Sequence, residues 1–279
     1  MSRVTLGLAA LTVLDCDPLA QIDLAEHHGF DAIGVRLTPA SPGTPAYPLH
    51  EERARLDAVR HRLEDSPIEV LDVEILRLTP DFNLTSVRTF LEASQLLGAR
   101  AVLVAGNDAH RTRLTDNYAL LAQACAEYGL VAALEPMPWT QVKNVREALE
   151  VVALADGAAA MARSVLVDTL HVARSETTLE DIAAIPAEWI HYAQLSDGSV
   201  PAPRDEGELI RQAREERQVP GEGGIGVAGI LAALPLNTPI SVELPNEQLR
   251  RAAGTGPWLD RLAAAARSVI DSCGKTPGA

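Results

Sequence analysis

The chain has 279 residues, of which 47% are hydrophobic and 22% are charged, and its formal net charge is −14 at pH 7. Such an acidic chain is not expected to bind nucleic acid or an anionic membrane, because both require a basic surface. The three cysteines, Cys16, Cys125 and Cys273, form no CxxC pair, which indicates free thiols in a reducing compartment and hence a cytoplasmic protein.

Eight short apolar segments recur along the chain and are predicted to be strands. Their apolar character is nearly continuous, which is typical of parallel strands that are covered on both faces. In chain order they are VTLGLAAL, DAIGVRL, EVLDVEIL, AVLVAG, LVAALEP, SVLVD, IHYAQLSD and ISVELP. The first is followed by Asp15 and Asp17 and is too short to span a bilayer, so we predict neither a signal peptide nor a membrane anchor there.

Longer stretches with the spacing of amphipathic helices lie between the strands. Three of them, PLAQIDLAEHHGF, TSVRTFLEASQLLGA and NYALLAQACAEYGL, contain Gly29, Gly98 and Gly129 near their ends. We expect each glycine to adopt the left-handed conformation that stops a helix. Strand and helix alternate eight times, which predicts a single-domain α/β fold, a (β/α)8 TIM barrel. An open doubly wound sheet is less consistent with the sequence, because no GxGxxG turn follows the first strand.

Two long connections and the C-terminus complete the predicted organisation. Residues 38–49 are rich in Pro and Gly and read as a loop after the second strand. Residues 196–225 form the longest insertion, with a short helix around EGELIRQAREER. We assign residues 1–272 to the barrel and residues 273–279 to a flexible C-terminal tail.

Oxygen-bearing side chains stand at the ends of four consecutive predicted strands. The active site of a TIM barrel lies at the C-terminal ends of its strands, where these side chains converge. They are Glu135, Asp168, Gln194 and Glu243. Each could separately be a helix cap or an ion-pair partner, but three clustered carboxylates repel one another unless a cation lies between them. We therefore expect a metal ion, with Asp168 among its ligands.

This constellation resembles the xylose-isomerase-like superfamily of sugar isomerases and epimerases, over nearly the whole chain and most specifically from residue 130 to 245. The resemblance implies that one divalent ion is held by Glu135, Asp168, Gln194 and Glu243. The segment DTLH matches the family's D-x-x-H, so His171 would face the substrate, and RQVPGEG matches its R-x-x-P-G-x-G loop, so Arg217 would bind the substrate. Gln194 stands where many members have His, and glutamine at this position is associated with hydroxypyruvate-isomerase-like and dehydroshikimate-dehydratase-like members.

The expected chemistry follows from this ligand set. Three carboxylates and an amide oxygen suit a hard ion, Mn²⁺ or Mg²⁺, for which Co²⁺ could substitute. Such an ion would polarise a substrate carbonyl and stabilise the enediolate that forms when the neighbouring carbon loses its proton. Glu135 and Glu243 are the expected catalytic acid–base pair, while His171 and Arg217 would hold the substrate oxygens and offset negative charge.

The predicted function is that of a metal-dependent isomerase or epimerase acting on a small hydroxy-ketone or keto-sugar. The alternative is a carbon–oxygen lyase, a dehydratase of the dehydroshikimate or keto-inositol type, because the same site would eliminate water from a substrate with a leaving hydroxyl β to the carbanion. We expect a small-molecule substrate as the partner, with a homodimer or homotetramer as the candidate assembly.

Several further residues have two interpretations. Trp139 either stacks on the substrate or packs in the core, and Glu74 either reaches the substrate or pairs with Arg36 along the barrel. We assign Trp139 and Glu74 to substrate binding. The basic residues Arg204, Arg211 and Arg214 alternate with acidic ones and are predicted to form a solvated face.

Two other classes of protein fit the sequence less well. Apurinic endonucleases share the barrel but use several zinc ions and many histidines, whereas here His171 alone, among seven histidines, lies at a predicted strand end. A non-catalytic binding barrel would have lost a catalytic glutamate, but Glu135 and Glu243 are both present.

Overall fold

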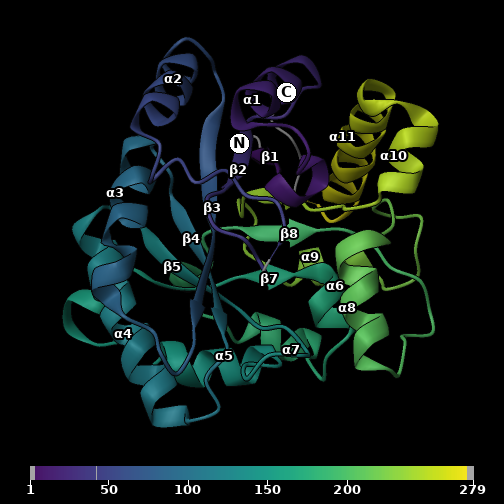
Figure 1. The fold of residues 1–279 in the computed structure, drawn as a ribbon. Helices are drawn as coiled ribbons and strands as arrows, with labels where there is room; N and C mark the ends of the chain where they lie inside the picture. The colour runs from purple at the N-terminus through teal and green to yellow at the C-terminus, as the bar shows by residue number, and fades with distance from the viewer. Residues whose placement is uncertain (1–3, 42, 275–279) are drawn as a thin grey trace.

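The computed structural model describes residues 4–41 and 43–274 and forms a barrel of strands surrounded by helices (Figure 1). Every pair of neighbouring strands in the described chain is parallel. Within the described residues the strands are β1 (Leu6–Leu8), β2 (Ala32–Arg36), β3 (Glu69–Leu78), β4 (Ala101–Gly106), β5 (Val131–Glu135), β6 (Arg163–Val165), β7 (Val167–Asp168), β8 (Ala193–Leu195) and β9 (Ile240–Val242).

The order of the strands confirms the predicted TIM barrel. Neighbours follow the chain around the sheet in the order β6-β5-β4-β3-β2-β1-β9-β8-β7. The two end strands, β6 and β7, come from one predicted strand that is divided at Leu166. Since β6 pairs with β5 and β7 pairs with β8, the join at Leu166 nearly closes the sheet into a ring. The eight predicted strands therefore correspond to the eight strand positions around a barrel.

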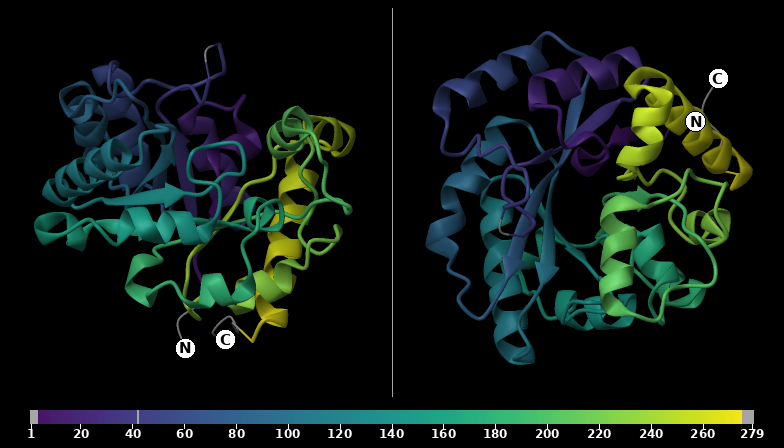
Figure 2. Two further views of the ribbon diagram at one scale, coloured as in Figure 1. Left: turned by 90° about the horizontal axis from the view of Figure 1, so that it is seen from below. Right: turned by 45° about the vertical axis from the view of Figure 1, so that its right-hand side comes forward.

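Helices cover the outside of this ring. In Figure 1, α2, α3 and α4 lie on one side of the barrel and α10 and α11 on the other, and Figure 2 shows the same wrapping from two further directions. The α-helices are α1 (Pro18–His27), α2 (Arg53–Glu64), α3 (Arg88–Leu96), α4 (Arg111–Glu127), α5 (Val145–Val152), α6 (Thr169–Ala173), α7 (Leu179–Ala183), α8 (Glu206–Glu215), α9 (Val227–Ala232), α10 (Glu247–Ala253) and α11 (Thr255–Ser272). Short 3-10 helices lie at η1 (Ala10–Val13), η2 (Leu84–Val87), η3 (Gly157–Met161) and η4 (Ala187–Trp189).

The three helix stops were predicted correctly. Gly29, Gly98 and Gly129 follow α1, α3 and α4 with φ angles of 74°, 71° and 69°. A residue with a Cβ atom is strained in this conformation, whereas glycine adopts it freely and lets the chain turn sharply into the next strand.

The nearly continuous apolar strands arise because both faces are buried. In β4, Ala101, Leu103 and Ala105 belong to a hydrophobic cluster inside the barrel, while Val102 and Val104 belong to the larger cluster between strands and helices. Successive side chains of a strand point to opposite faces, so a barrel strand that is covered on both faces needs apolar residues at every position.

The long connections lie where the sequence placed them. Residues 38–41 and 43–49 contain no helix or strand, and α8 falls within the insertion 196–225. Asp197 and Gln218, near the two ends of that insertion, form an antiparallel bridge. Most of the predicted flexible tail, residues 275–279, lies outside the described residues. Over the residues that the structure describes, no helix has the length and apolar character needed to span a membrane.

Candidate metal and substrate site

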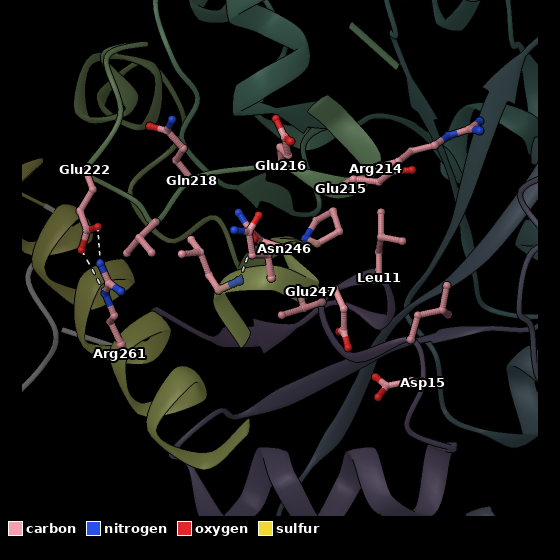
Figure 3. A pocket seen from close by; sticks show the side chains of 16 residues that line it. Leu11, Asp15, Arg214, Glu215, Glu216, Gln218, Glu222, Asn246, Glu247 and Arg261 are labelled. Atoms are coloured by element: carbon pink, nitrogen blue, oxygen red, sulfur yellow. Dashed lines mark hydrogen bonds and ion pairs between the residues drawn. The ribbon is translucent and has the colours of Figure 1, made fainter. Parts of the chain in front are cut away.

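Two hollows lie side by side at the C-terminal ends of the strands. The smaller, of about 290 Å³, is lined by six of the eight predicted metal, catalytic and substrate-binding residues, namely Glu74, Glu135, Trp139, His171, Arg217 and Glu243. The larger is a groove of about 840 Å³ between residues 214–222, α10 and α11, shown in Figure 3. Leu11, Leu14, Arg214 and Glu215 line both hollows. We place the chemistry in the smaller one, because Glu74, Glu135 and Glu243 are buried there. In the groove, charged groups such as Glu222 and Arg261 are exposed and paired with each other.

The four predicted ligand side chains come from the ends of their strands, and two of them, Glu135 and Glu243, line the smaller pocket, whereas Asp168 and Gln194 are not part of its lining. Glu135 is the last residue of β5, Asp168 is the last residue of β7, Gln194 lies in β8 and Glu243 follows β9. These four side chains are all buried. The geometry of the barrel therefore brings residues that are far apart in sequence to one end of the ring.

Asp168 caps a helix with one carboxylate oxygen and leaves the other oxygen for further contacts. It is the N-cap of α6, where its Oδ1 accepts a hydrogen bond from the His171 backbone N–H at 2.9 Å. This cap turns the chain directly from β7 into α6 and fixes His171 within the first turn of that helix. The spacing of Asp and His in DTLH thus follows from helix capping, and it leaves the second carboxylate oxygen for other partners.

Glu135, Asp168 and His171 form the one cluster of potential metal-ligating side chains, in groups of at least three, among the described His, Cys, Asp and Glu residues. One ligand atom from each lies within 4.8 Å of the others. The His171 Nε2 atom is 3.5 Å from Glu135 Oε1, and its Nδ1 atom is 3.9 Å from Asp168 Oδ1. The ring of Trp139 meets the His171 ring edge to face, with centroids 4.9 Å apart, so the indole supports the imidazole.

Glu243 and Gln194 are joined to this cluster through Arg217. The Arg217 guanidinium lies 2.6 Å from Asp168 Oδ2 and 2.6 Å from Glu243 Oε2. Gln194 Nε2 donates to Glu243 Oε1 at 3.0 Å. Arg217 is itself held by hydrogen bonds from its Nε to the Ala213 carbonyl and from its NH1 to Ser196 Oγ. One guanidinium therefore balances two buried carboxylates directly.

The donor set fits a divalent cation. Glu135 Oε1 and Gln194 Oε1 are buried oxygen atoms without a hydrogen-bond partner among the described residues. Leaving such acceptors unsatisfied is costly, whereas a cation would satisfy both. Because the side-chain N–H of Gln194 donates to Glu243, the side-chain carbonyl oxygen of Gln194 remains to act as a ligand.

The pKa values of the acidic groups reflect their crowding. Burial raises the pKa of Glu135 well above its usual range, and the neighbouring carboxylates of Glu243 and Asp168 raise it further. Burial also raises the pKa of Glu243 to about 7, although Arg217 opposes the shift. Burial acts in the same direction on Asp168, but there Arg217 and His171 prevail, so the pKa of Asp168 falls below its usual value. A single arginine cannot neutralise three buried carboxylates.

His171 is neutral at pH 7. Burial lowers its pKa to about 4, and the attraction of Asp168 only partly opposes this shift. A neutral imidazole donates at one ring nitrogen and accepts at the other. Arg217, whose pKa is raised because the attraction of Asp168 and Glu243 outweighs the effect of burial, is therefore the source of positive charge beside these carboxylates.

Glu74 pairs with Arg36 as predicted, and its contact with a substrate stays a prediction. Its Oε2 atom accepts a hydrogen bond from Arg36 NH2 at 2.7 Å, and both residues line the pocket. The sequence interpretation gave no role to Arg77 and placed Arg214 on a solvated face, yet both line the pocket as well. For Arg77, the available signal was its position at the C-terminal end of β3, the end at which the other site residues lie.

The chain is similar to a curated enzyme and to a known family. The family model of the xylose isomerase-like TIM barrel matches residues 22–271. The 3-dehydroshikimate dehydratase of Pseudomonas aeruginosa is 30% identical over 189 residues, which make up 64% of this chain and 29% of that protein. The match thus spans less than a third of the length of this curated relative.

Solved structures share the fold at low sequence identity. The IOLI protein with a bound zinc atom has a TM-score of 0.77 at 18% identity, covering 96% of this chain and 98% of its own. A xylose isomerase-like TIM barrel/4-hydroxyphenylpyruvate dioxygenase fusion protein has a TM-score of 0.77 at 21% identity, covering 96% of this chain and 43% of its own. A D-psicose 3-epimerase has a TM-score of 0.70 at 13% identity, covering 96% and 99%. Since the family model matches most of the chain and these structures share its barrel, the chain belongs to the xylose isomerase-like TIM barrel family.

Proposed function

We propose that this protein is a divalent-metal-dependent enzyme that removes a proton from the carbon next to a carbonyl group of a small molecule. The observation that carries the proposal is a buried cluster of three carboxylates, Glu135, Asp168 and Glu243, of which Glu135 and Glu243 line the pocket. Among the described residues, Glu135 and Gln194 each keep an oxygen atom without a hydrogen-bond partner. The pocket volume of about 290 Å³ suits a small substrate.

Glu135, Asp168, Gln194 and Glu243 would hold the ion. When bound, a divalent ion polarises the substrate carbonyl and stabilises the negative charge that develops on the substrate oxygens. Oxygen ligands favour Mn²⁺ or Mg²⁺, with Co²⁺ as a substitute, while the relative with a bound zinc atom makes Zn²⁺ a fourth ion to test. His171 lies close enough to Glu135 and Asp168 to add a nitrogen ligand or to contact the substrate.

Glu135 and Glu243 are the proposed acid and base. Deprotonated, one of them accepts the proton of the substrate C–H bond, whose electron pair moves toward the carbonyl oxygen. A raised pKa matches this task, since a carboxyl that titrates near neutral pH both accepts and returns protons. In an isomerase or epimerase, the proton returns to a neighbouring carbon or to the opposite face of the same carbon.

Elimination of water is the second outcome of the same first step. Where a hydroxyl lies β to the deprotonated carbon, the electron pair forms a C=C bond, the C–O bond breaks and the departing hydroxide takes a proton from the acid. The 30% identity with a 3-dehydroshikimate dehydratase favours this outcome. Because that match covers 29% of the relative, the dehydratase activity is one of two proposed reactions and not an assignment.

The remaining side chains would position the substrate. Neutral His171 is suited to a hydrogen bond with a substrate hydroxyl, and Arg217 to a developing oxyanion. Trp139 offers an apolar wall, and Glu74, fixed by Arg36, offers an acceptor oxygen, Oε1, that has no partner among the described residues.

A panel assay tests the proposal. The protein is stripped with a chelator, reloaded with one ion at a time, and incubated with 3-dehydroshikimate, keto-inositols and small ketoses. We expect turnover of at least one compound that appears only with a divalent ion and disappears in Asp168→Ala. Turnover that is equal in the stripped protein would contradict the proposal.

A further inference from the structure

Two guanidinium groups at the pocket form no ion pair with an acidic residue of the described chain. Arg77 lies in β3 and is half-buried. Its Nε donates to the Ala40 carbonyl at 3.1 Å and its NH1 to Asn107 Oδ1 at 2.9 Å, and it forms no ion pair within the described part of the chain. Neutral partners on one side hold the side chain in place without neutralising its charge.

Arg214 approaches the same pocket from α8. It is exposed and lines both the pocket and the neighbouring groove. In Figure 3 its side chain extends away from the other labelled groove residues. No ion pair or hydrogen bond joins its side chain to another described residue, and this includes Glu215, the adjacent acidic residue in the lining. In contrast, Arg211 on the same helix pairs with Glu208 and Glu216.

These two arginines differ from the other two that line the pocket. Arg36 pairs with Glu74, and Arg217 pairs with Asp168 and Glu243. The pKa of Arg77 is lowered by burial and then by the positive charge of Arg214, although Glu135 acts in the opposite direction. Two like charges that are close enough to influence each other repel, and an anion bound between them would relieve this repulsion.

We propose that Arg77 and Arg214 bind an anionic group of the substrate, a carboxylate or a phosphate. The inference rests on the proposed function, because it assigns this pocket to the substrate. The guanidinium of arginine presents paired N–H donors that match both kinds of oxyanion. The substrate would therefore carry adjacent oxygen atoms for the acidic cluster at one end and a negative charge at the other.

Binding measurements on two matched pairs of compounds test this inference. The carboxylate pair is 3,4-dihydroxybenzoate and 3,4-dihydroxybenzamide, and the phosphate pair is dihydroxyacetone phosphate and dihydroxyacetone. Each compound carries adjacent oxygens, and within a pair only the anion changes. Calorimetry on the Mn²⁺-loaded full chain should show tighter binding of one anionic member, by about tenfold or more. The pair that shows this preference identifies the anion.

Substitutions connect the preference to the two arginines. Arg77→Gln and Arg214→Gln should each reduce the preference for the anion to within about threefold, while metal content stays at the wild-type level. Arg77 also donates to Ala40 and Asn107, so its substitution can disturb folding. In that case the binding preference of Arg214→Gln, which changes an exposed side chain, decides the test. Arg88→Gln on α3 is the control, because it removes one exposed positive charge that does not line the pocket.

The outcomes separate this inference from the proposed function. Equal affinity within both pairs, absence of binding by both anionic compounds, or a preference that survives in Arg214→Gln would overturn the anion site. Loss of the metal dependence of binding and turnover, with the anion preference retained, would overturn the proposed function and leave the anion site standing.

Discussion

Arg217 donates to Asp168 Oδ2 across 2.6 Å, although the two residues are 49 positions apart in the chain. The same guanidinium lies 2.6 Å from Glu243 Oε2. An internal cation therefore lies among the carboxylates that we propose as metal ligands. Asp168 and Glu243 are thus shared between the arginine and the metal ion, and this sharing leads to the first prediction.

Arg217→Ala should lower the stability of the metal-free protein more than that of the metal-loaded protein. Without the arginine, Asp168 and Glu243 are buried charges without a partner, and breaking a buried pair in this way costs about 3–5 kcal/mol. A bound divalent ion supplies replacement charge, so metal content should persist while turnover falls. Urea unfolding with and without Mn²⁺ measures the difference. Arg211→Ala, which removes an exposed arginine of α8, is the control. Equal losses with and without the ion would contradict the prediction.

Replacing both proposed acid–base groups should abolish exchange of the substrate hydrogen with solvent. Glu135→Gln and Glu243→Gln keep side-chain size and one ligand oxygen but cannot accept a proton. We expect each metal-replete variant to exchange the hydrogen α to the carbonyl with D₂O about 10²-fold more slowly or worse, as for removal of a general base. Exchange is followed by NMR, with metal content measured in the same samples. A metal-replete double variant that exchanged at the wild-type rate would show that another group is the base.

The metal-free protein should lose stability as the pH rises from about 4.5 to about 7. The pKa of Glu243 is about 7 in the folded protein and about 4.5 when exposed, so the folded state retains a proton that the unfolded chain has already lost. The stabilisation is complete below pH 4.5 and is lost as the pH rises through 7. Glu135 shifts in the same direction. Urea unfolding of wild type and Glu243→Gln measures the effect, and the variant should show the shallower pH dependence. Identical slopes would mean that Glu243 is ionised throughout this range.

Gln194→His should retain metal binding and shift the preference of the site toward Zn²⁺ and Co²⁺. An imidazole nitrogen suits these ions better than Mg²⁺, which prefers oxygen ligands. Gln194→Leu, which removes the ligand and leaves Glu243 Oε1 without its donor, should weaken binding of every ion. Competition between Mg²⁺ and Zn²⁺ at fixed pH checks both variants. An unchanged preference in Gln194→His, together with full metal content in Gln194→Leu, would remove Gln194 from the ligand set.

The sequence by itself determined the barrel. Continuous apolar segments specified strands that are buried on both faces, as β4 illustrates. Gly29, Gly98 and Gly129 specified where helices end. These are local properties, since they depend on the period of side chains along a strand and on the conformations open to glycine. The strand-end positions of Glu135, Asp168, Gln194 and Glu243 followed from the same reading.

The tertiary structure decided how those side chains meet. The family motif pointed Arg217 toward the substrate, but its ion pairs with Asp168 and Glu243 depend on how the segment after α8 returns to the barrel. The neutrality of His171 follows from burial, which a sequence does not display. The charge state of a side chain in a pocket depends on its burial and on neighbouring charges from several strands, and only folding brings these neighbours together.

Arg77 shows why the rest of the site could not be read from the chain. In a regular strand, Glu74 and Arg77 would point to opposite faces, because they are an odd number of positions apart. The register of β3 against β4 shifts between Val73 and Leu76, and both Glu74 and Arg77 line the pocket. An irregularity of this kind depends on pairing with the neighbouring strand and reverses the alternation of faces along one strand. The apolar pattern thus determined the strands of the barrel, while the register between strands decided which charged side chains line the pocket.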